Sequence, residues 1–388
     1  MSGRCALCSS SDLSVFLERP DVPVHQNLPL ESRAAALSVT RGDLRLACCR
    51  RCGFVMNTAF DSGLLAYGAA YENDQTFSAE FDHHVDTLLS ALVDDGAREK
   101  FIVEIGCGRG QFLRRLCELG RNRATGFDPS YVGPDTVDDE RVTFVRDYYG
   151  PKYQNVRPDI VVCRHVIEHV AAPLELLGAV RAALGGTRAD AAFETPTVAW
   201  ILENLVIQDF FYEHCSYFTA DTLAYAFRLA GFAPKDVREV FGGQYLWLRA
   251  TFEPSVTPDV GCPPSARILA LASRFRDHEE KRVTELRQRL ERLRESGCVA
   301  VWGAGAKGAT YVHLLDPHGD LVDCVIDINP RKQGRFLPAT GHPIVAPDKI
   351  GERNIRSIIV MNANYANEIR TDVRNLGFEV SIYAEGEM

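Results

Sequence analysis

Apolar and polar positions along the middle of the chain follow the pattern of a covered parallel sheet. From residue 101 onward, short apolar runs ending in Gly, Asp or Pro are followed by stretches with helical spacing, as in "FIVEIGCGRG" and then "QFLRRLCELG". Apolar runs of this length with amphipathic helices between them indicate strands buried on both faces. We therefore predict a doubly wound α/β fold for this region.

The pattern changes after this region. Residues 265–296 carry charged side chains at helical spacing with few breakers, which predicts a long connecting helix. A second α/β pattern then begins at "CVAVWGAGAKGATYVHLL" and is too short for a full two-half dinucleotide fold. We expect three domains, at residues 1–72, 73–264 and 265–388.

Charge and composition exclude several classes of protein. The 388 residues carry a net charge of -9 with a pI near 5.6, which argues against a nucleic-acid partner. The N-terminus lacks a signal-peptide profile, and no apolar stretch of about 18 residues is present. We expect a cytoplasmic protein without a membrane partner. A monomer is favoured because no extended heptad is evident.

Some of the twelve cysteines need a role other than disulfide formation, because the cytoplasm keeps thiols reduced. The stretches "CALC" and "CCRRC" contain two Cys-x-x-Cys pairs, the arrangement of a tetrahedral four-thiolate zinc site. Four thiolates leave no open position, so this zinc is expected to be structural; five unligated buried thiols are the alternative. The predicted ligands are Cys5, Cys8, Cys49 and Cys52, with Cys48 left over.

Two glycine loops each follow a strand and open a helix. The first, "VEIGCGRG", is followed by acidic residues at the ends of the next two strands, and together these resemble the S-adenosylmethionine (SAM) site of class I methyltransferases. Purely structural glycines are the alternative interpretation. The residues expected to hold SAM are Glu104, Gly106, Gly108, Gly110, Asp128 for the ribose and Asp147 for the adenine.

The second loop, "WGAGAKG", fits a dinucleotide fingerprint, with Asp327 about 20 residues further on. A nicotinamide oxidoreductase is therefore one hypothesis, and a degenerate structural domain is another. We favour a half-Rossmann module in which Gly303 and Gly305 cradle a pyrophosphate and Lys307 supplies a positive charge.

The stretch "HVIEH" matches the His-x-x-Glu-His pattern of zinc hydrolases. It comes directly after the strand "DIVVC", and no third ligand from elsewhere in the chain suggests itself. We therefore expect no zinc at His165, Glu168 and His169, and we expect Arg164 and His165 to contact SAM instead.

Motifs spread over the whole chain resemble the three-domain nucleotide-sugar C-methyltransferases of deoxysugar biosynthesis. They are "CRRCGFVMNTAF", "YENDQTFS", "VEIGCGRGQFL", "CRHVIEHV", "FYEHCSYFT", "GGQYLWL" and "GAGAKG" with "NYANEI". The resemblance implies a zinc-binding N-terminal domain, a SAM domain and a C-terminal Rossmann-like domain. It also implies methyl transfer to a carbon next to the keto group of a sugar linked to a nucleoside diphosphate.

The stretch "DFFYEHCSYF" then becomes the predicted catalytic segment, because carbon methylation needs a base that removes a proton alpha to a carbonyl. The family's proposed catalytic histidine matches His214. A plain aromatic core, methyl transfer to oxygen or nitrogen, and a non-catalytic zinc module are the alternatives. The further residues expected in catalysis are Glu213, Tyr212 and Tyr71, and those expected to bind substrate, besides the second glycine loop, are Tyr67 and Asn204.

Overall fold

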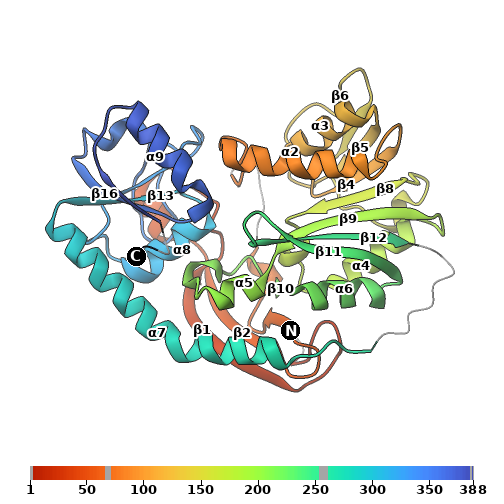
Figure 1. Ribbon diagram of the computed structural model, residues 1–388, viewed down its shortest axis with the longest axis horizontal. Coiled ribbons are helices and arrows are strands. Elements are labelled where there is room, and N and C mark those ends of the chain that lie inside the picture. Colours follow the sequence, from red (N-terminus) through yellow and green to blue (C-terminus); the bar gives the residue numbers. More distant parts are fainter. Residues whose placement is uncertain (1–2, 66–70, 253–260, 385–386, 388) are drawn as a thin grey trace.

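The computed structural model describes residues 3–65, 71–252, 261–384 and 387. Figure 1 shows three sheets, with one long helix, α7 (Ala266–Glu295), running along the N-terminal sheet to the C-terminal one. Within the described residues, no helix is long and apolar enough to cross a bilayer. Tyr67 lies outside the described residues.

The N-terminal part contains a four-stranded antiparallel sheet in the order β1-β2-β3-β10. Its last strand comes from far along the chain, directly after the "YEHC" stretch. This strand pairs with β3, so the predicted catalytic segment is fixed where the N-terminal and central parts meet. The elements of this part are β1 (Leu13–Pro23), α1 (Arg33–Leu37), β2 (Arg41–Cys49), β3 (Val55–Asn57), η1 (Ser62–Leu64) and β10 (Ser216–Tyr217).

The central part is an eight-stranded sheet in the order β11-β12-β9-β8-β4-β5-β7-β6. Five neighbouring strands from β9 to β7 are parallel, β12 is antiparallel to β9, and β11 is antiparallel to β12. The chain order reverses between β4 and β8, which is where ligands bind in open α/β sheets. The strands are β4 (Phe101–Ile105), β5 (Arg123–Phe127), β6 (Thr136–Val137), β7 (Val142–Val145), β8 (Ile160–Arg164), β9 (Ala189–Pro196), β11 (Phe232–Val240) and β12 (Tyr245–Phe252).

Helices cover both faces of this sheet, which confirms the predicted doubly wound fold (Figure 1). Ile102 on β4 packs into the core formed with α2 and α3, whereas its neighbour Val103 packs into the core formed with α4 and α6. Because successive strand residues point to opposite faces, a strand covered on both sides is apolar throughout. The helices are α2 (Ala79–Asp94), α3 (Gln111–Gly120), α4 (Pro173–Ala183), α5 (Val198–Glu203) and α6 (Ala220–Leu229), with short 3-10 turns η2 (Pro151–Tyr153), η3 (Ile167–His169) and η4 (Ile207–Asp209).

The C-terminal part has a five-stranded parallel sheet in the order β15-β14-β13-β16-β17. Helix α7 joins it to the rest of the chain, and Phe275 of α7 packs against Phe16 of β1 and Phe210, with ring centroids 6.3 and 5.1 Å away. The elements are β13 (Cys298–Trp302), α8 (Ala306–Leu315), β14 (Cys324–Ile326), β15 (Ile344–Val345), η5 (Pro347–Ile350), β16 (Ile355–Val360), η6 (Ala363–Tyr365), α9 (Ala366–Asn375) and β17 (Ser381–Ala384).

Candidate active site

The first glycine loop forms a tight turn at the carboxyl end of β4. Gly106, Gly108 and Gly110 all have positive φ, at 68°, 52° and 76°. A Cβ at Gly106 would lie 2.2 Å from Val166, and one at Gly110 would lie 2.3 Å from Phe144, so both positions require glycine. At Gly108 no atom of the described residues lies within 4 Å of that position, so the turn borders open space there.

The two acidic residues predicted for ribose and adenine stand at neighbouring strand ends. One carboxylate oxygen of Asp128 accepts the Gly108 N–H at 2.9 Å, and the other accepts the Ser130 N–H and hydroxyl at 2.8 and 2.6 Å. These contacts hold Asp128 against the glycine turn. Asp147 follows β7 and accepts the Tyr153 hydroxyl at 2.6 Å. Both residues lie at the carboxyl ends of parallel strands of the central sheet, which we call the cofactor edge. Their contacts with a ligand stay predictions.

Glu104, at the same edge, is buried, and its Oε2 has no hydrogen-bond partner among the described residues. Burial raises the pKa of Glu104 to about 8, although the positive charge of Arg164 opposes the shift. A buried carboxylate oxygen without a donor is costly. A positively charged ligand beside the glycine turn would supply the missing interaction, so this site fits the cationic cofactor SAM.

Glu194, which sequence reasoning missed, organises the polar groups beside the cofactor edge. This fully buried residue of β9 accepts Arg164 Nε at 2.7 Å and His84 Nε2 at 2.5 Å, and it lies 3.3 Å from His165 Nε2. Burial raises the pKa of Glu194, but the positive charges of Arg164 and His165 outweigh it and hold that pKa well below its usual range. Burial lowers the pKa of His165, but Glu194 and Glu168 raise it to about 9. The predicted contacts of Arg164 and His165 with SAM stay predictions.

A cavity of about 270 Å³ lies between the three parts of the chain. Its walls come from the segment before α2, from the turn after β8 and the loop before β10, and from the turn between β13 and α8. It brings together residues that the sequence placed in separate motifs. The predicted site residues in its wall are Tyr71, His165, His214, Gly303, Gly305 and Lys307.

His214 is partly exposed and lies in the wall of this cavity. Its ring centroid is 4.1 Å from that of Phe211 and 4.7 Å from that of His169. Burial lowers the pKa of His214 well below its usual value, and the positive charges of His169, His165 and Lys307 act in the same direction. The imidazole is therefore neutral near pH 7 and has a lone pair to accept a proton.

Tyr212 and Glu213, the two residues before His214, point away from the cavity, which corrects the predictions for them. Tyr212 is fully buried, and its hydroxyl accepts the Asp61 N–H at 2.8 Å and donates to the Asp61 carbonyl at 3.2 Å. Glu213 is fully buried, accepts the Gln26 N–H at 2.9 Å and lies 3.3 Å from His25 Nδ1. Both side chains therefore hold the N-terminal part against this segment instead of facing a substrate.

The prediction for Asn204 is also corrected. The residue is exposed at the C-terminal end of α5, where its side chain donates to the Trp200 carbonyl at 2.8 Å, and it is not part of the cavity wall. The prediction for Tyr67 falls outside the described residues. Tyr71 does lie in the wall, with its hydroxyl 3.4 Å from Asn27 Nδ2.

The acidic residue that follows the second glycine loop accepts backbone N–H groups, as Asp128 does at the first loop. The carboxylate of Asp327 accepts the backbone N–H groups of Ala304 and Asn329 at 2.7 and 2.8 Å, and it lies 3.8 Å from Lys332 Nζ. These contacts fix Asp327 beside the second glycine loop. The helix that follows, α8, has no side-chain cap on its first turn, and its first residues line the cavity.

Lys307, in the first turn of α8, is tied to the central part of the chain. Its Nζ lies 2.7 Å from an Asp209 carboxylate oxygen and donates to Gln244 Oε1 at 3.1 Å. Gln244 also exchanges two hydrogen bonds, at 2.8 and 2.9 Å, with the side chain of Asn362. Asp209 belongs to the "DFFYEHC" stretch, so the second glycine loop and the predicted catalytic segment hold each other in place.

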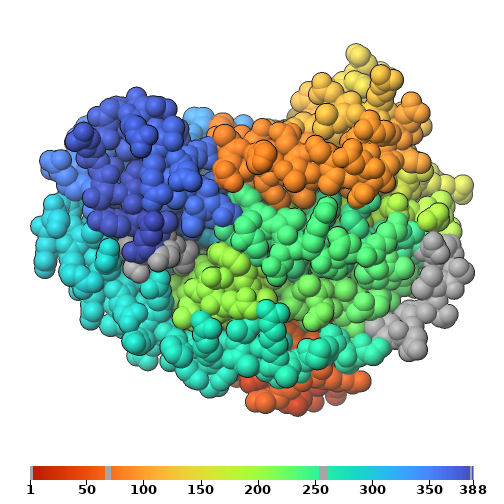
Figure 2. Space-filling view, in the orientation of Figure 1, coloured from red at the N-terminus to blue at the C-terminus, as the bar shows by residue number. Residues whose placement is uncertain are grey.

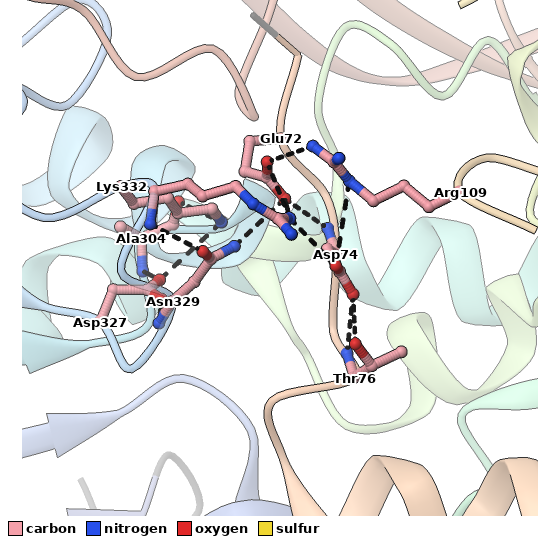
Figure 3. A network of polar contacts seen from close by, with 9 residues as sticks. Glu72, Asp74, Thr76, Arg109, Ala304, Asp327, Asn329 and Lys332 are labelled. Carbon is pink, nitrogen blue, oxygen red and sulfur yellow. Dashed lines mark hydrogen bonds and ion pairs between the residues drawn. The ribbon is translucent and has the colours of Figure 1, made fainter. Parts of the chain in front are cut away.

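Residues 72–76, which we call the strap, connect the first glycine loop to the C-terminal part (Figure 3). Glu72 accepts Arg109 at 3.0 Å, Asn329 at 3.2 Å and Arg331 at 3.3 Å. Asp74 accepts Arg331 at 3.1 Å and lies 3.9 Å from Arg109. Arg109 stands between two glycines of the first glycine loop, and Arg331 follows β14, so the strap bridges the first glycine loop and the loop after β14.

The start of α2 is capped from the C-terminal part. Glu368 of α9 accepts the Ser78 hydroxyl at 2.6 Å and the Ala79 N–H at 2.7 Å. A carboxylate at a helix N-terminus satisfies free N–H groups and the helix dipole. Figure 2 shows the C-terminal part, in blue, in contact with α2, in orange. In the sequence, the strap and the capped start of α2 are visible only as the polar run "ENDQTFS". This run does not indicate which distant residues its side chains contact.

The four predicted cysteine ligands come together. The Sγ atoms of Cys5, Cys8, Cys49 and Cys52 all lie within 4.8 Å of one another. Two of the pairs, Cys5 with Cys52 and Cys8 with Cys49, are 3.6 and 3.5 Å apart. Four sulfurs around one zinc lie roughly 3.8 Å apart, given a Zn–S distance of about 2.3 Å. This cluster therefore has the geometry of a closed zinc site, and Cys48 lies outside it.

Two protein families match parts of this chain. Residues 78–236 match the family described as a methyltransferase domain, and residues 267–378 match the C-methyltransferase C-terminal domain. The chain is a SAM-dependent methyltransferase that carries a C-methyltransferase C-terminal domain. It is 24% identical to the C-methyltransferase NovU of Streptomyces niveus over 94% of this chain and 90% of that protein.

This methyltransferase also matches solved structures over its central part. One is the Burkholderia thailandensis 1,6-didemethyltoxoflavin-N1-methyltransferase with bound S-adenosylhomocysteine, at 21% identity, 46% of this chain, 80% of that chain and a TM-score of 0.34. Another is the magnesium protoporphyrin IX methyltransferase of Synechocystis, at 15% identity, 45% of this chain, 84% of that chain and a TM-score of 0.34.

Proposed function

We propose that this enzyme methylates the carbon next to the keto group of a sugar linked to a nucleoside diphosphate, with His214 as the base. The observation that carries the proposal is a single cavity lined both by His214 and by the start of α8. The first can remove a proton, and the second can bind an anion.

The α8 end of the cavity suits a diphosphate. Helix N-termini with free N–H groups bind phosphate, and α8 begins at a glycine turn with no side-chain cap. Two lysines, Lys307 and Lys332, lie in the wall of the cavity. Asp209 offsets part of the charge of Lys307, and Asp327 offsets part of the charge of Lys332. A diphosphate here would leave the attached sugar to extend toward the "DFFYEHC" segment.

The other end of the cavity suits enolisation. His214 would take the proton from the carbon next to the carbonyl, and SAM supplies the methyl group that this carbon then accepts. His165, whose pKa lies at about 9, is a cation in the same wall and would stabilise the negative charge that develops on the enolate oxygen. Tyr71 is a second hydrogen-bond donor in the wall.

The test is to supply SAM with a 13C-labelled methyl group and thymidine-diphosphate-linked 4-keto sugars. We expect a product whose carbon NMR signal shows the new methyl on a carbon atom. A methyl on oxygen or nitrogen would replace the proposal with the O- or N-methyltransferase alternative. Turnover of keto compounds that lack a diphosphate at the same kcat/KM would contradict the assignment of the α8 end.

A further inference from the structure

Three metal-ligating side chains converge inside the cavity, although the sequence suggested no third ligand for the "HVIEH" motif. One ligand atom each from Glu168, His169 and His214 lies within 4.8 Å of the others. The first two follow β8 in η3, and the third comes from the loop before β10. Two imidazoles and one carboxylate are a common ligand set for divalent transition metals.

The backbone fixes these two segments relative to each other. The Cys215 N–H donates to the Glu168 carbonyl at 3.0 Å, and the Ser216 hydroxyl donates to the Val170 carbonyl at 2.7 Å. The first bond joins the residue after His214 to the carbonyl of Glu168, and the second joins the first residue of β10 to the residue after His169. The three side chains therefore start from positions that the fold holds in place, as a preorganised site requires.

One oxygen of the Glu168 carboxylate is held by the protein, and the other is available to a ligand. Its Oε2 accepts the Thr195 hydroxyl at 3.0 Å, an outer contact of the kind that orients metal ligands. Its Oε1 has no hydrogen-bond partner among the described residues, although Glu168 is only 2% exposed. His165 Nδ1 is 3.4 Å from this oxygen.

We propose that Glu168, His169 and His214 form a second metal site, which takes a divalent transition ion such as Zn²⁺ and inhibits methyl transfer when it is filled. The inhibitory part rests on the proposed function, because the ion would occupy the lone pair with which His214 removes the substrate proton. The ion would also place a positive charge where the base has to accept one.

The surrounding charges permit a cation at this position. Lys307 is 2.7 Å from Asp209, and His165 is 3.3 Å from Glu194, so each neighbouring cation already has an acidic partner. Three protein ligands leave at least one position open toward the cavity, unlike the four-cysteine cluster. The two sites therefore differ in ligand type and in access, and the thiolate site is expected to hold its zinc more tightly.

The test is a calorimetric titration with Zn²⁺ of full-length protein that has been treated briefly with EDTA and that retains its cysteine-bound zinc. We expect one additional equivalent to bind to the wild type. Glu168→Gln and His169→Ala should weaken this binding at least tenfold, and Thr195→Ala, which removes only the outer contact, should weaken it about 10- to 100-fold. His278→Ala, at an exposed histidine of α7, is the control and should change nothing.

Absence of an additional equivalent in the wild type, or unchanged binding in both Glu168→Gln and His169→Ala, would overturn the metal site. Titration needs no substrate, so this result stands apart from the proposed function. In the methyl-transfer assay, Zn²⁺ should inhibit over the same concentration range in which the additional equivalent binds. Binding without inhibition would overturn the inhibitory role, and activation by Zn²⁺ would do so as well.

Discussion

At the scale of single residues, neighbours in one motif have different roles. Tyr212 packs so closely on Gly42 that a Cβ there would lie 2.5 Å from its ring. Glu213 binds the backbone of Gln26, and His214 alone reaches the cavity. The sequence indicated which residue types gather in "YEH", but the directions of the side chains depend on partners 151 and 187 residues away in the chain, which no local pattern encodes.

The glycine turn after β4 and the acidic residues at the strand ends were easier to predict, because both are local features of the chain. Asp128 is the residue whose ligand contact most needs a test. Asp128→Ala should weaken binding of S-adenosylhomocysteine by about 1.5 to 3 kcal/mol, since a charged hydrogen-bond partner is lost. Calorimetry measures this change, with Ser130→Ala as the control for the local turn. An unchanged affinity in Asp128→Ala would show that the ribose is held elsewhere.

At the scale of elements, the cysteine turns and the strands of the central sheet could be predicted because spacing and apolar periodicity determine them. β10 could not be predicted, because its two residues take their strand conformation from β3 in the N-terminal sheet. The strap is similar, since its only regular feature is a set of contacts with distant arginines.

The cysteine cluster gives an element-scale prediction. Purified protein dialysed against EDTA should keep one zinc per chain, and Cys49→Ser should lose it, because zinc binding by such small sites is part of the folding free energy. Cys48→Ser is the matched control: its thiol is equally buried but lies outside the cluster, so it should keep the zinc. Metal analysis of the three proteins decides this, and a wild type without zinc would refute the site.

Asp316, at the end of α8, gives a pH-dependent prediction. Its carboxylate accepts three N–H groups of residues 320–322 and lies 3.2 Å from His342 Nε2. Burial raises the pKa of Asp316, but these hydrogen bonds outweigh burial and lower it below its usual value. The carboxylate therefore stabilises the fold fully above the unfolded-chain pKa of about 3.9, and this contribution is lost as the pH falls through the folded-state pKa.

Asp316→Asn should accordingly lower the free energy of unfolding by about 1 to 3 kcal/mol at neutral pH. The difference from the wild type should shrink as the pH is lowered below about 4. Urea unfolding at a series of pH values measures both, with the exposed Asp320→Asn as a control that should stay within about 0.5 kcal/mol of the wild type. A difference that does not depend on pH would contradict the role of the ionised carboxylate.

At the scale of the whole molecule, the cavity exists because three parts of the chain hold one another. The strap joins the first glycine loop to the loop after β14, Glu368 caps α2, and the pair of Gln244 with Asn362 joins the central and C-terminal parts. In each contact, a buried or partly buried polar group of one part of the chain forms a hydrogen bond with a group of another part. The order of domains could be read from the sequence, whereas the way they meet follows from these pairings.

Glu72→Gln tests this arrangement. It removes the negative charge shared by Arg109 and Arg331, so the variant should lose about 1 to 3 kcal/mol of stability in urea unfolding. Glu118→Gln, at an exposed position on α3, is the matched control and should stay within about 0.5 kcal/mol of the wild type. Equal stability of both variants would show that the strap does not hold the parts together.

The central claim is that His214 removes a proton next to the substrate carbonyl before the methyl group is transferred. The most direct measurement is deuterium uptake, followed by mass spectrometry, into a thymidine-diphosphate-linked 4-keto sugar in D₂O, with S-adenosylhomocysteine in place of SAM. We expect the wild type to place solvent deuterium at the alpha carbon faster than the enzyme-free reaction, and His214→Gln to bind S-adenosylhomocysteine normally but to lose this exchange. Exchange at the wild-type rate in His214→Gln, or methyl transfer by a wild type that shows no exchange, would contradict the account.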